Sequence, residues 1–89
     1  IAMQEEYNFT LTLPLADLEE ALLLLQEVQG NYPQMRLSRK PDRLGSARFY
    51  LCFPFSGVRT DLRFLQWFEG RNRKKWQLFG PNYGVWGFT

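Results

Sequence analysis

Few residues in this sequence have side chains suited to covalent or metal chemistry. The chain contains no histidine, and its single cysteine, Cys52, lies in an apolar stretch. Thiol–imidazole catalysis and ordinary zinc sites require histidine or several cysteines, so the sequence excludes both. One cysteine also excludes an internal disulfide, and its apolar neighbours predict a small buried side chain. We therefore expect no cofactor, no metal site and no catalytic residue in these 89 residues.

Carboxylates gather beside the start of an apolar run. Asp17 is followed three residues later by Glu20, a spacing typical of a capping box at the start of a helix. Acidic side chains there also suit the positive end of a helix dipole. Helix capping explains these acids without general acid catalysis, and no glycine-rich phosphate-binding loop accompanies them.

Charge is distributed unevenly along the chain, although the formal net charge is only +2. Residues 1–35 contain six acids and no base, whereas the rest of the chain contains all eleven bases and three acids. This polarity can guide self-association or attract an anionic partner, but helices with solvated charged faces are the simpler explanation. The densest basic run, residues 71–75, is interpreted first as a solvated connection and second as an anion-binding patch.

The elements that must position these side chains begin with a strand and a helix. Apolar and polar residues alternate over 7–13, which is typical of a half-buried strand. Apolar residues then recur at helical spacing over 18–28, and Gly30 is a suitable stop. Leu23 and Leu24 widen the apolar stripe. Wide contact with the core explains them, and contact with a neighbouring chain is the alternative.

Residues 36–55 predict a β-hairpin around which the rest of the chain is arranged. Its second arm is apolar on both faces over 49–55, so we place it in the middle of a sheet. The first arm is more polar and closes at Pro41, because proline cannot donate to a ladder. Gly45 supplies the turn, since glycine tolerates positive φ.

The remaining third of the chain predicts a helix and a last strand. After a break at 56–57, a helix capped by Thr60 runs to Gly70, and residues 76–79 form the strand. Residues 80–84 are predicted to form a turn. The apolar tail 85–88 then packs on the open face of the sheet or on another subunit. In the second helix, Leu62, Leu65 and Phe68 share one face, with Phe64 and Trp67 beside it.

The predicted order is strand, helix, strand, strand, helix, strand. Two right-handed crossovers of this kind make a ferredoxin-like βαββαβ sandwich of the α+β class. We expect four antiparallel strands in the spatial order 4-1-3-2, with both helices on one face. We divide the chain into an N-terminal extension (1–6), one domain (7–83) and an apolar tail (84–89).

A ferredoxin-like sheet rich in aromatic residues is also the framework of RNA-recognition modules. These modules place rings on the outward face of the two central strands, within a pattern that includes small residues at fixed positions. Residues 46–53 lack both small residues at the positions where the pattern requires them, and the outward Asn8, Thr10 and Thr12 offer no ring to stack on a base. Nucleic acid is therefore not the expected partner. If it were bound, the run 71–75 would be the surface.

The hairpin resembles the ACT domain, a small module that senses amino acids, of the type at the C-terminus of prephenate dehydratases. That family carries Glu-Ser-Arg-Pro at the end of its second strand, then a turn with glycine and an aromatic-rich strand. Here Ser38-Arg39-Lys40-Pro41 occupies the first segment, Gly45 the turn and residues 49–55 the strand. Residues 56–61 are similar to the family's loop into its second helix.

The resemblance extends over about residues 7–83. Residues 78–83 are similar to the Leu-Gly-Ser-Tyr with which such domains end. Where the family has Gly-Ala-Leu between its first strand and helix, this chain has Ala16-Asp17-Leu18. The family's glycine lets backbone amides approach bound phenylalanine. The resemblance implies a ligand site with Ala16, Asp17 and Leu18 on one wall and Leu37, Ser38, Arg39 and Lys40 on the other.

The function implied by the resemblance is regulatory. The domain would bind L-phenylalanine, or another amino acid, between two copies of itself in a homodimer. Ligand that prefers one arrangement of the copies would shift the attached prephenate-dehydratase-like enzyme of phenylalanine biosynthesis by about 1–3 kcal/mol. Two alternatives stay open: a ligand-free ACT-like dimerisation module that uses Leu23, Leu24 and 85–88, and a nucleic-acid-binding module.

The sequence carries no sign of membrane insertion. No apolar run approaches the roughly 20 residues that span a bilayer, and the start lacks a basic-then-apolar signal pattern. We therefore expect no membrane partner and a cytoplasmic location.

Overall fold

The computed structural model describes residues 2–54 and 60–88, with side chains described for 6–54 and 62–83. Within these ranges the elements follow the predicted order, with one short 3-10 helix added after the first strand. The strands are β1 (Ala2–Pro14), β2 (Arg36–Arg43), β3 (Ser46–Pro54) and β4 (Gln77–Phe88). The helices are η1 (Leu15–Asp17), α1 (Leu18–Asn31) and α2 (Thr60–Arg71).

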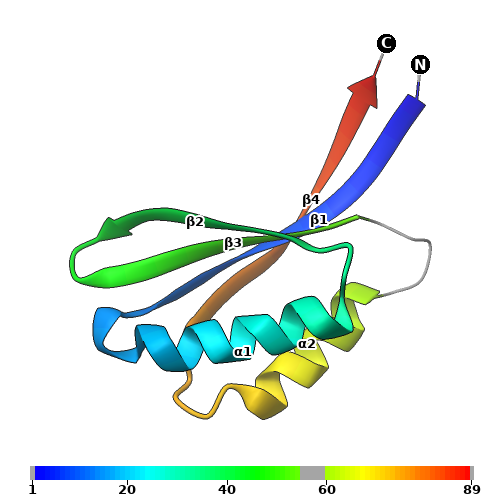
Figure 1. Cartoon of the computed structure of the whole chain (residues 1–89). Coiled ribbons are helices and arrows are strands. Elements are labelled where there is room, and N and C mark those ends of the chain that lie inside the picture. The colour runs from blue at the N-terminus through cyan, green and yellow to red at the C-terminus, as the bar shows by residue number, and fades with distance from the viewer. Residues whose placement is uncertain (1, 55–59, 89) are drawn as a thin grey trace.

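The strands form one antiparallel sheet in the order β2-β3-β1-β4. This is the predicted spatial order, and both helices cover the same face of the sheet (Figure 1). The ferredoxin-like α+β prediction is therefore confirmed. No helix of the described residues lies on the opposite face of the sheet, so we distinguish a helix-covered face and an open face.

The core lies between the sheet and the helices, and it is formed largely by the side chains of β1 and β3 that point toward the helices. Successive side chains of a strand point to opposite faces, so every second residue of β1 and β3 reaches the helices. These inward side chains are almost fully buried: Tyr7, Phe9, Leu11 and Leu13 from β1, and Ala47, Phe49, Leu51 and Phe53 from β3. The sheet contributes most of the apolar surface that the helices must cover.

Phe64 of α2 is fully buried at the centre of an aromatic cluster. Aromatic rings whose centroids lie about 4.5–7 Å apart attract each other beyond the effect of their buried area. The centroid of the Phe64 ring lies 4.8 Å from that of Phe53, 5.0 Å from Phe9, 5.5 Å from Phe68 and 5.7 Å from Tyr32.

The packing face of α2 differs from the predicted one. Phe64 and Phe68, one helical turn apart, are the buried residues, whereas Leu62 is 52% exposed. The two rings fill the space beneath β1 and β3 more completely than leucines would. They therefore set the rotation of the helix and turn Leu62 outward. Residue Arg71 ends α2, one position later than the predicted Gly70.

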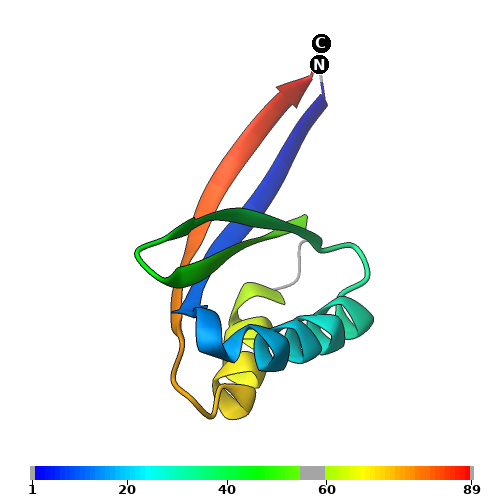
Figure 2. The same cartoon turned by 60° about the vertical axis from the view of Figure 1, so that its left-hand side comes forward.

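β1 and β4 extend beyond the rest of the sheet as a two-stranded arm (Figures 1 and 2). Their pairing reaches Ala2 opposite Phe88, whereas β3 joins β1 only from Glu6. Two predictions are wrong here: β1 does not begin at Tyr7, and residues 80–84 lie in β4 instead of forming a turn. The tail 85–88, predicted to pack on the open face of the sheet or on another subunit, pairs edge to edge with β1. Backbone pairing with a long partner strand overrides the turn preference of glycine and proline.

The hairpin between β2 and β3 closes with the two residues Leu44 and Gly45. Both have positive φ, 52° and 79°, as tight hairpin turns between twisted strands require. The prediction for Gly45 is confirmed. Pro41, however, does not end the arm, since β2 continues to Arg43. Proline is tolerated there because β2 is an edge strand and its register shifts between Lys40 and Arg43.

The start and end of α1 also differ from the prediction. Asp17 occupies the N-cap position, but its side chain makes no capping hydrogen bond. At the other end the helix continues past Gly30 to Asn31, and the Tyr32 N–H donates to the Val28 carbonyl at 2.8 Å. The helix therefore needs neither the predicted capping box nor a glycine stop.

None of the described helices is both long enough and apolar enough to cross a bilayer. The predicted strand end at Phe55 and the break at 56–57 lie outside the described residues.

Candidate functional site

Cys52 faces the open side of the sheet but is only 3% exposed. The Arg36 Nη2 donates to its sulfur at 3.4 Å and to the Glu6 carboxylate at 2.7 Å. Burial raises the pKa of the Cys52 thiol, so the thiol stays protonated near neutral pH. This small polar cluster holds β1, β2 and β3 together on the open face. Within the described residues, no group of three or more cysteines and acids is placed to hold a metal ion.

Asp17 joins the start of α1 to the connection between α2 and β4. Its carboxylate accepts hydrogen bonds from the indole nitrogen of Trp76 at 2.9 Å and from the Lys74 ammonium at 3.0 Å. Asn72 holds that connection in shape, because its side-chain amide donates to the Trp76 carbonyl and accepts from the Trp76 N–H. The hydrogen bond from Trp76, followed by that from Lys74, lowers the pKa of Asp17. Asp17 is therefore engaged within the fold and does not point toward a ligand.

The fall of stability at low pH, the acid limb of the curve of melting temperature against pH, should depend on Asp17. Its folded-state pKa lies below the ordinary value of 3.8, so the ionised form stabilises the fold above about pH 4. That stabilisation is lost as the pH falls toward the folded-state pKa. Asp17→Asn should lower the melting temperature at pH 7 and flatten its fall between about pH 5 and 2. Circular dichroism melts across this range measure the effect.

Asp42→Asn is the matched control for that experiment. Asp42 pairs with Arg39 at 2.9 Å on the surface, and exposed pairs contribute little. The control should keep the wild-type acid limb. An acid limb as steep in Asp17→Asn as in the wild type would contradict the role of Asp17.

The other residues of the first predicted wall lie close by. Ala16 is exposed in η1, and Leu18 is half-buried against the core. The Leu15 N–H donates to the Gly45 carbonyl at 3.1 Å, which ties this segment to the hairpin turn. The junction of β1 and α1 thus lies beside the hairpin.

Strand alternation divides the second predicted wall between the two faces of the sheet. Leu37 and Arg39 lie on the helix-covered side, where the Arg39 guanidinium is 5.8 Å from the centroid of the Phe49 ring. Ser38 and Lys40 lie on the open side, and the Lys40 ammonium is 5.3 Å from the centroid of the Tyr50 ring. The four residues therefore do not line one site within a single copy of the chain.

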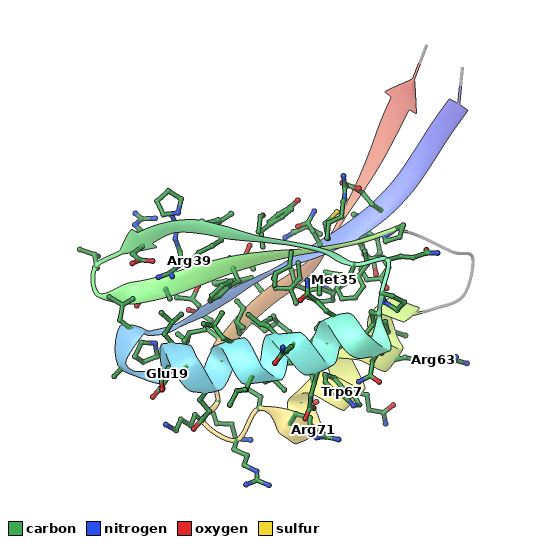
Figure 3. The ribbon with its side chains drawn as sticks, in the orientation of Figure 1. Glu19, Met35, Arg39, Arg63, Trp67 and Arg71 are labelled. Carbon is green, nitrogen blue, oxygen red and sulfur yellow. The ribbon has the colours of Figure 1, made fainter. Side chains whose placement is uncertain are left out.

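A groove of about 500 Å³ runs between α1 and the β2 edge of the sheet. Leu37 forms its sheet side, and exposed leucines of α1 form its helix side. Glu19 marks one end of the groove, toward the hairpin, where Figure 3 also shows Arg39 on β2. The full lining is Glu19, Leu22, Leu23, Leu25, Gln26, Gln29 and Leu37.

Two of the four bases in the run 71–75 are paired with acids of the first half of the chain. Arg71 pairs with Glu27 at 3.1 Å, and Lys74 pairs with Asp17 at 3.0 Å and with Glu20 at 3.5 Å. The acids of the first half of the chain and the bases of the second half thus form ion pairs with each other within one domain. This surface is a weaker anion-binding patch than its sequence indicates.

No protein-family model, curated protein or solved structure matches the chain.

Two residues of these surfaces were missed in the sequence. Glu19 is one of the acids in the first turn of α1, and its place one helical turn before Leu23 puts both on one side of the helix. Phe79 was assigned to a strand without a face. Its neighbour Leu78 packs against the core, and successive residues of a strand point to opposite faces, so Phe79 points to the open side.

Proposed function

We propose that this domain is an ACT-type regulatory module that binds a free amino acid, L-phenylalanine by resemblance, in the groove between α1 and β2. The observation that carries the proposal is the make-up of this groove. Its lining offers an apolar wall and the Glu19 carboxylate. Arg39, two residues after Leu37 on the same side of β2, offers a basic side chain next to it. A zwitterion with an apolar side chain requires these three features together.

Each group of the ligand has a partner of suitable chemistry. The Glu19 carboxylate accepts from the ligand ammonium, and the Arg39 guanidinium offers paired donors to the ligand carboxylate. Arg39 is now paired with Asp42, but both side chains are exposed and such pairs contribute only about 0–1 kcal/mol. A ligand carboxylate can therefore replace Asp42. The leucines beside Leu37 receive the ligand side chain.

A second copy of the chain would close the groove. Leu23 is 66% exposed and Leu22 is also exposed, so α1 presents apolar surface that a partner can bury. The outer edge of β2 has no strand partner among the described residues. A homodimer through this surface encloses the ligand, and ligand binding then favours one arrangement of the two copies. In this proposal the domain is the regulatory part of a prephenate-dehydratase-like enzyme.

Calorimetric titration with L-phenylalanine, L-tyrosine and L-tryptophan tests the proposal. We expect binding of at least one of them. Arg39→Gln should weaken it about tenfold or more, because it removes a charge-assisted hydrogen bond. Arg63→Gln is the matched control, since Arg63 is an exposed base on α2, away from the groove (Figure 3). Equal weakening by both variants, or heat from none of the amino acids, would contradict the site.

The exposed leucines of α1 also favour a second candidate, a dimerisation module without ligand. Sedimentation velocity separates the two. A dimer whose concentration dependence no amino acid alters supports the ligand-free module, and Leu23→Glu should then convert it to monomer. A dimer that L-phenylalanine strengthens supports the sensor.

A further inference from the structure

The open face of the sheet carries two aromatic rings in one row across the strands. Ser38 of β2 lies opposite Tyr50 of β3, Tyr50 opposite Thr10 of β1, and Thr10 opposite Phe79 of β4. Neighbouring strands lie about 4.8 Å apart, so Tyr50 and Phe79 rise from strands about 10 Å apart. The small Thr10 side chain between them leaves the space above the sheet open.

Phe79 has little part in the core. It is 57% exposed and borders a hollow of about 330 Å³ together with Thr10, Arg43 and Arg48. The exposed Leu44 lines the same hollow, so Phe79 belongs to a small apolar patch, and apolar patches rimmed by polar residues mark binding sites. Cations and hydroxyl groups also line the hollow beside the ring. Such a surface suits a ligand that has both a flat apolar group and polar or anionic groups.

Positive charge surrounds this row. Lys40, Arg48 and Thr12 form the next row across the sheet, and the Lys40 ammonium lies 5.3 Å from the centroid of the Tyr50 ring. On the other side, Arg36 is paired with Glu6, which is only 4% exposed. The accessible charge of this face is therefore positive, although the chain as a whole is nearly neutral.

We infer that the open face binds single-stranded nucleic acid. Bases stack on the Phe79 and Tyr50 rings, and phosphates pair with Arg48, Lys40 and Arg43. A single strand fits because its unpaired bases expose their flat faces, whereas a duplex hides them within the stack. A base on Tyr50 displaces the Lys40 ammonium from the ring and leaves it free to pair with a phosphate.

Two features distinguish this surface from the alternatives weighed in the sequence. RNA-recognition modules place a ring on the outward face of the first strand, where β1 has Thr10 instead. The neighbouring strand β4 supplies a ring, Phe79, directly opposite Thr10. The basic run 71–75 lies beside the helices, where Arg71 and Lys74 are paired with acids. Among the described residues, the open face therefore offers both the rings and cations that form no ion pair: Lys40, Arg43 and Arg48, of which Arg48 donates from its Nε to the Pro41 carbonyl at 3.1 Å.

Fluorescence anisotropy with a labelled ten-nucleotide oligothymidylate and the matching oligouridylate tests the inference on the whole chain. We expect binding at about 50 mM salt that weakens as salt rises, with a slope of about 0.7 per phosphate contact. Phe79→Ala should weaken binding about 5- to 100-fold, the loss of one stacked base. Lys40→Gln should lower the salt slope by about 0.7. Tighter binding of either oligonucleotide supports the inference and identifies the preferred sugar.

Arg73→Gln is the matched control, because it removes one exposed charge from the surface beside the helices. It should leave the affinity unchanged. Absence of binding, equal affinity of Phe79→Ala and the wild type, or an equal loss in Arg73→Gln would overturn the inference. Tyr50→Ala provides an independent ring variant, and circular dichroism confirms that each variant is folded. These outcomes do not depend on Arg39, so they are separate from the amino-acid titration.

Discussion

Replacing Phe64 with alanine is expected to destabilise the domain by about 3–5 kcal/mol, the usual cost of truncating a buried phenylalanine. The ring is fully buried, and ring centroids of Phe9, Phe53 and Phe68 lie within 5.5 Å of its own. Truncation leaves a cavity that these rigid neighbours cannot fill. Urea denaturation followed by circular dichroism should show a much lower midpoint with an unchanged slope.

The matched control for this variant is Leu62→Ala in the same helix. Leu62 is 52% exposed, so its truncation should change the free energy of unfolding by about 0.5 kcal/mol or less. A small domain has only about 5–15 kcal/mol of stability, so Phe64→Ala should leave a substantial unfolded fraction. Similar midpoints for the two variants would mean that Phe64 does not organise the core.

The fold was predictable from this sequence because several independent patterns agree. Alternation over 7–13 and 49–55 specifies central strands, and helical spacing over 18–28 specifies a helix between them. Handedness and the short hairpin then leave few ways to order four strands. The order found, β2-β3-β1-β4, is the predicted one.

The two-stranded arm could not be predicted in the same way. Residues 80–84 contain two glycines and a proline, which locally favour a turn. Their strand conformation depends on partners 74 or more positions earlier: Asn8 opposite Asn82, Tyr7 opposite Tyr83 and Glu6 opposite Gly84. Local preference carries no information about such a distant partner.

The candidate site was predicted only in part, for a related reason. Residues 37–40 were treated as one wall, yet neighbouring strand residues point to opposite faces. Leu37 therefore lines the groove and Arg39 lies on the same side of β2, while Ser38 and Lys40 belong to the open face. Asp17 looked like a helix cap, but the position of Trp76, which takes up its carboxylate, depends on the tertiary fold.

Gly80→Ala should be nearly as destabilising as loss of the Phe64 ring, for the opposite physical reason. Gly80 has φ +129°, which side chains rarely adopt. A Cβ there would lie 2.6 Å from the Asn8 carbonyl oxygen and 2.7 Å from Cδ1 of Phe9. Backbone strain and overpacking each cost about 1–3 kcal/mol, so we expect a loss of about 2–5 kcal/mol in urea denaturation.

Gly70→Ala is the matched control, because a Cβ at this position in α2 meets nothing within 4 Å. Alanine should stabilise that helix by about 0.5–1 kcal/mol. A midpoint for Gly80→Ala at or above the wild-type value would contradict the close approach of Gly80 to β1. The close contact of Gly80 with β1 also fixes the position of the Phe79 ring on the open face. The register of β1 and β4 shifts here: Thr10 and Asn8 are two residues apart on β1, whereas their partners Phe79 and Asn82 are three residues apart on β4. This extra residue keeps Phe79 and Asn82 on the open face while Tyr83 turns toward the covered face. Gly80→Ala should therefore also weaken oligonucleotide binding in whatever fraction stays folded, whereas Gly70→Ala should not.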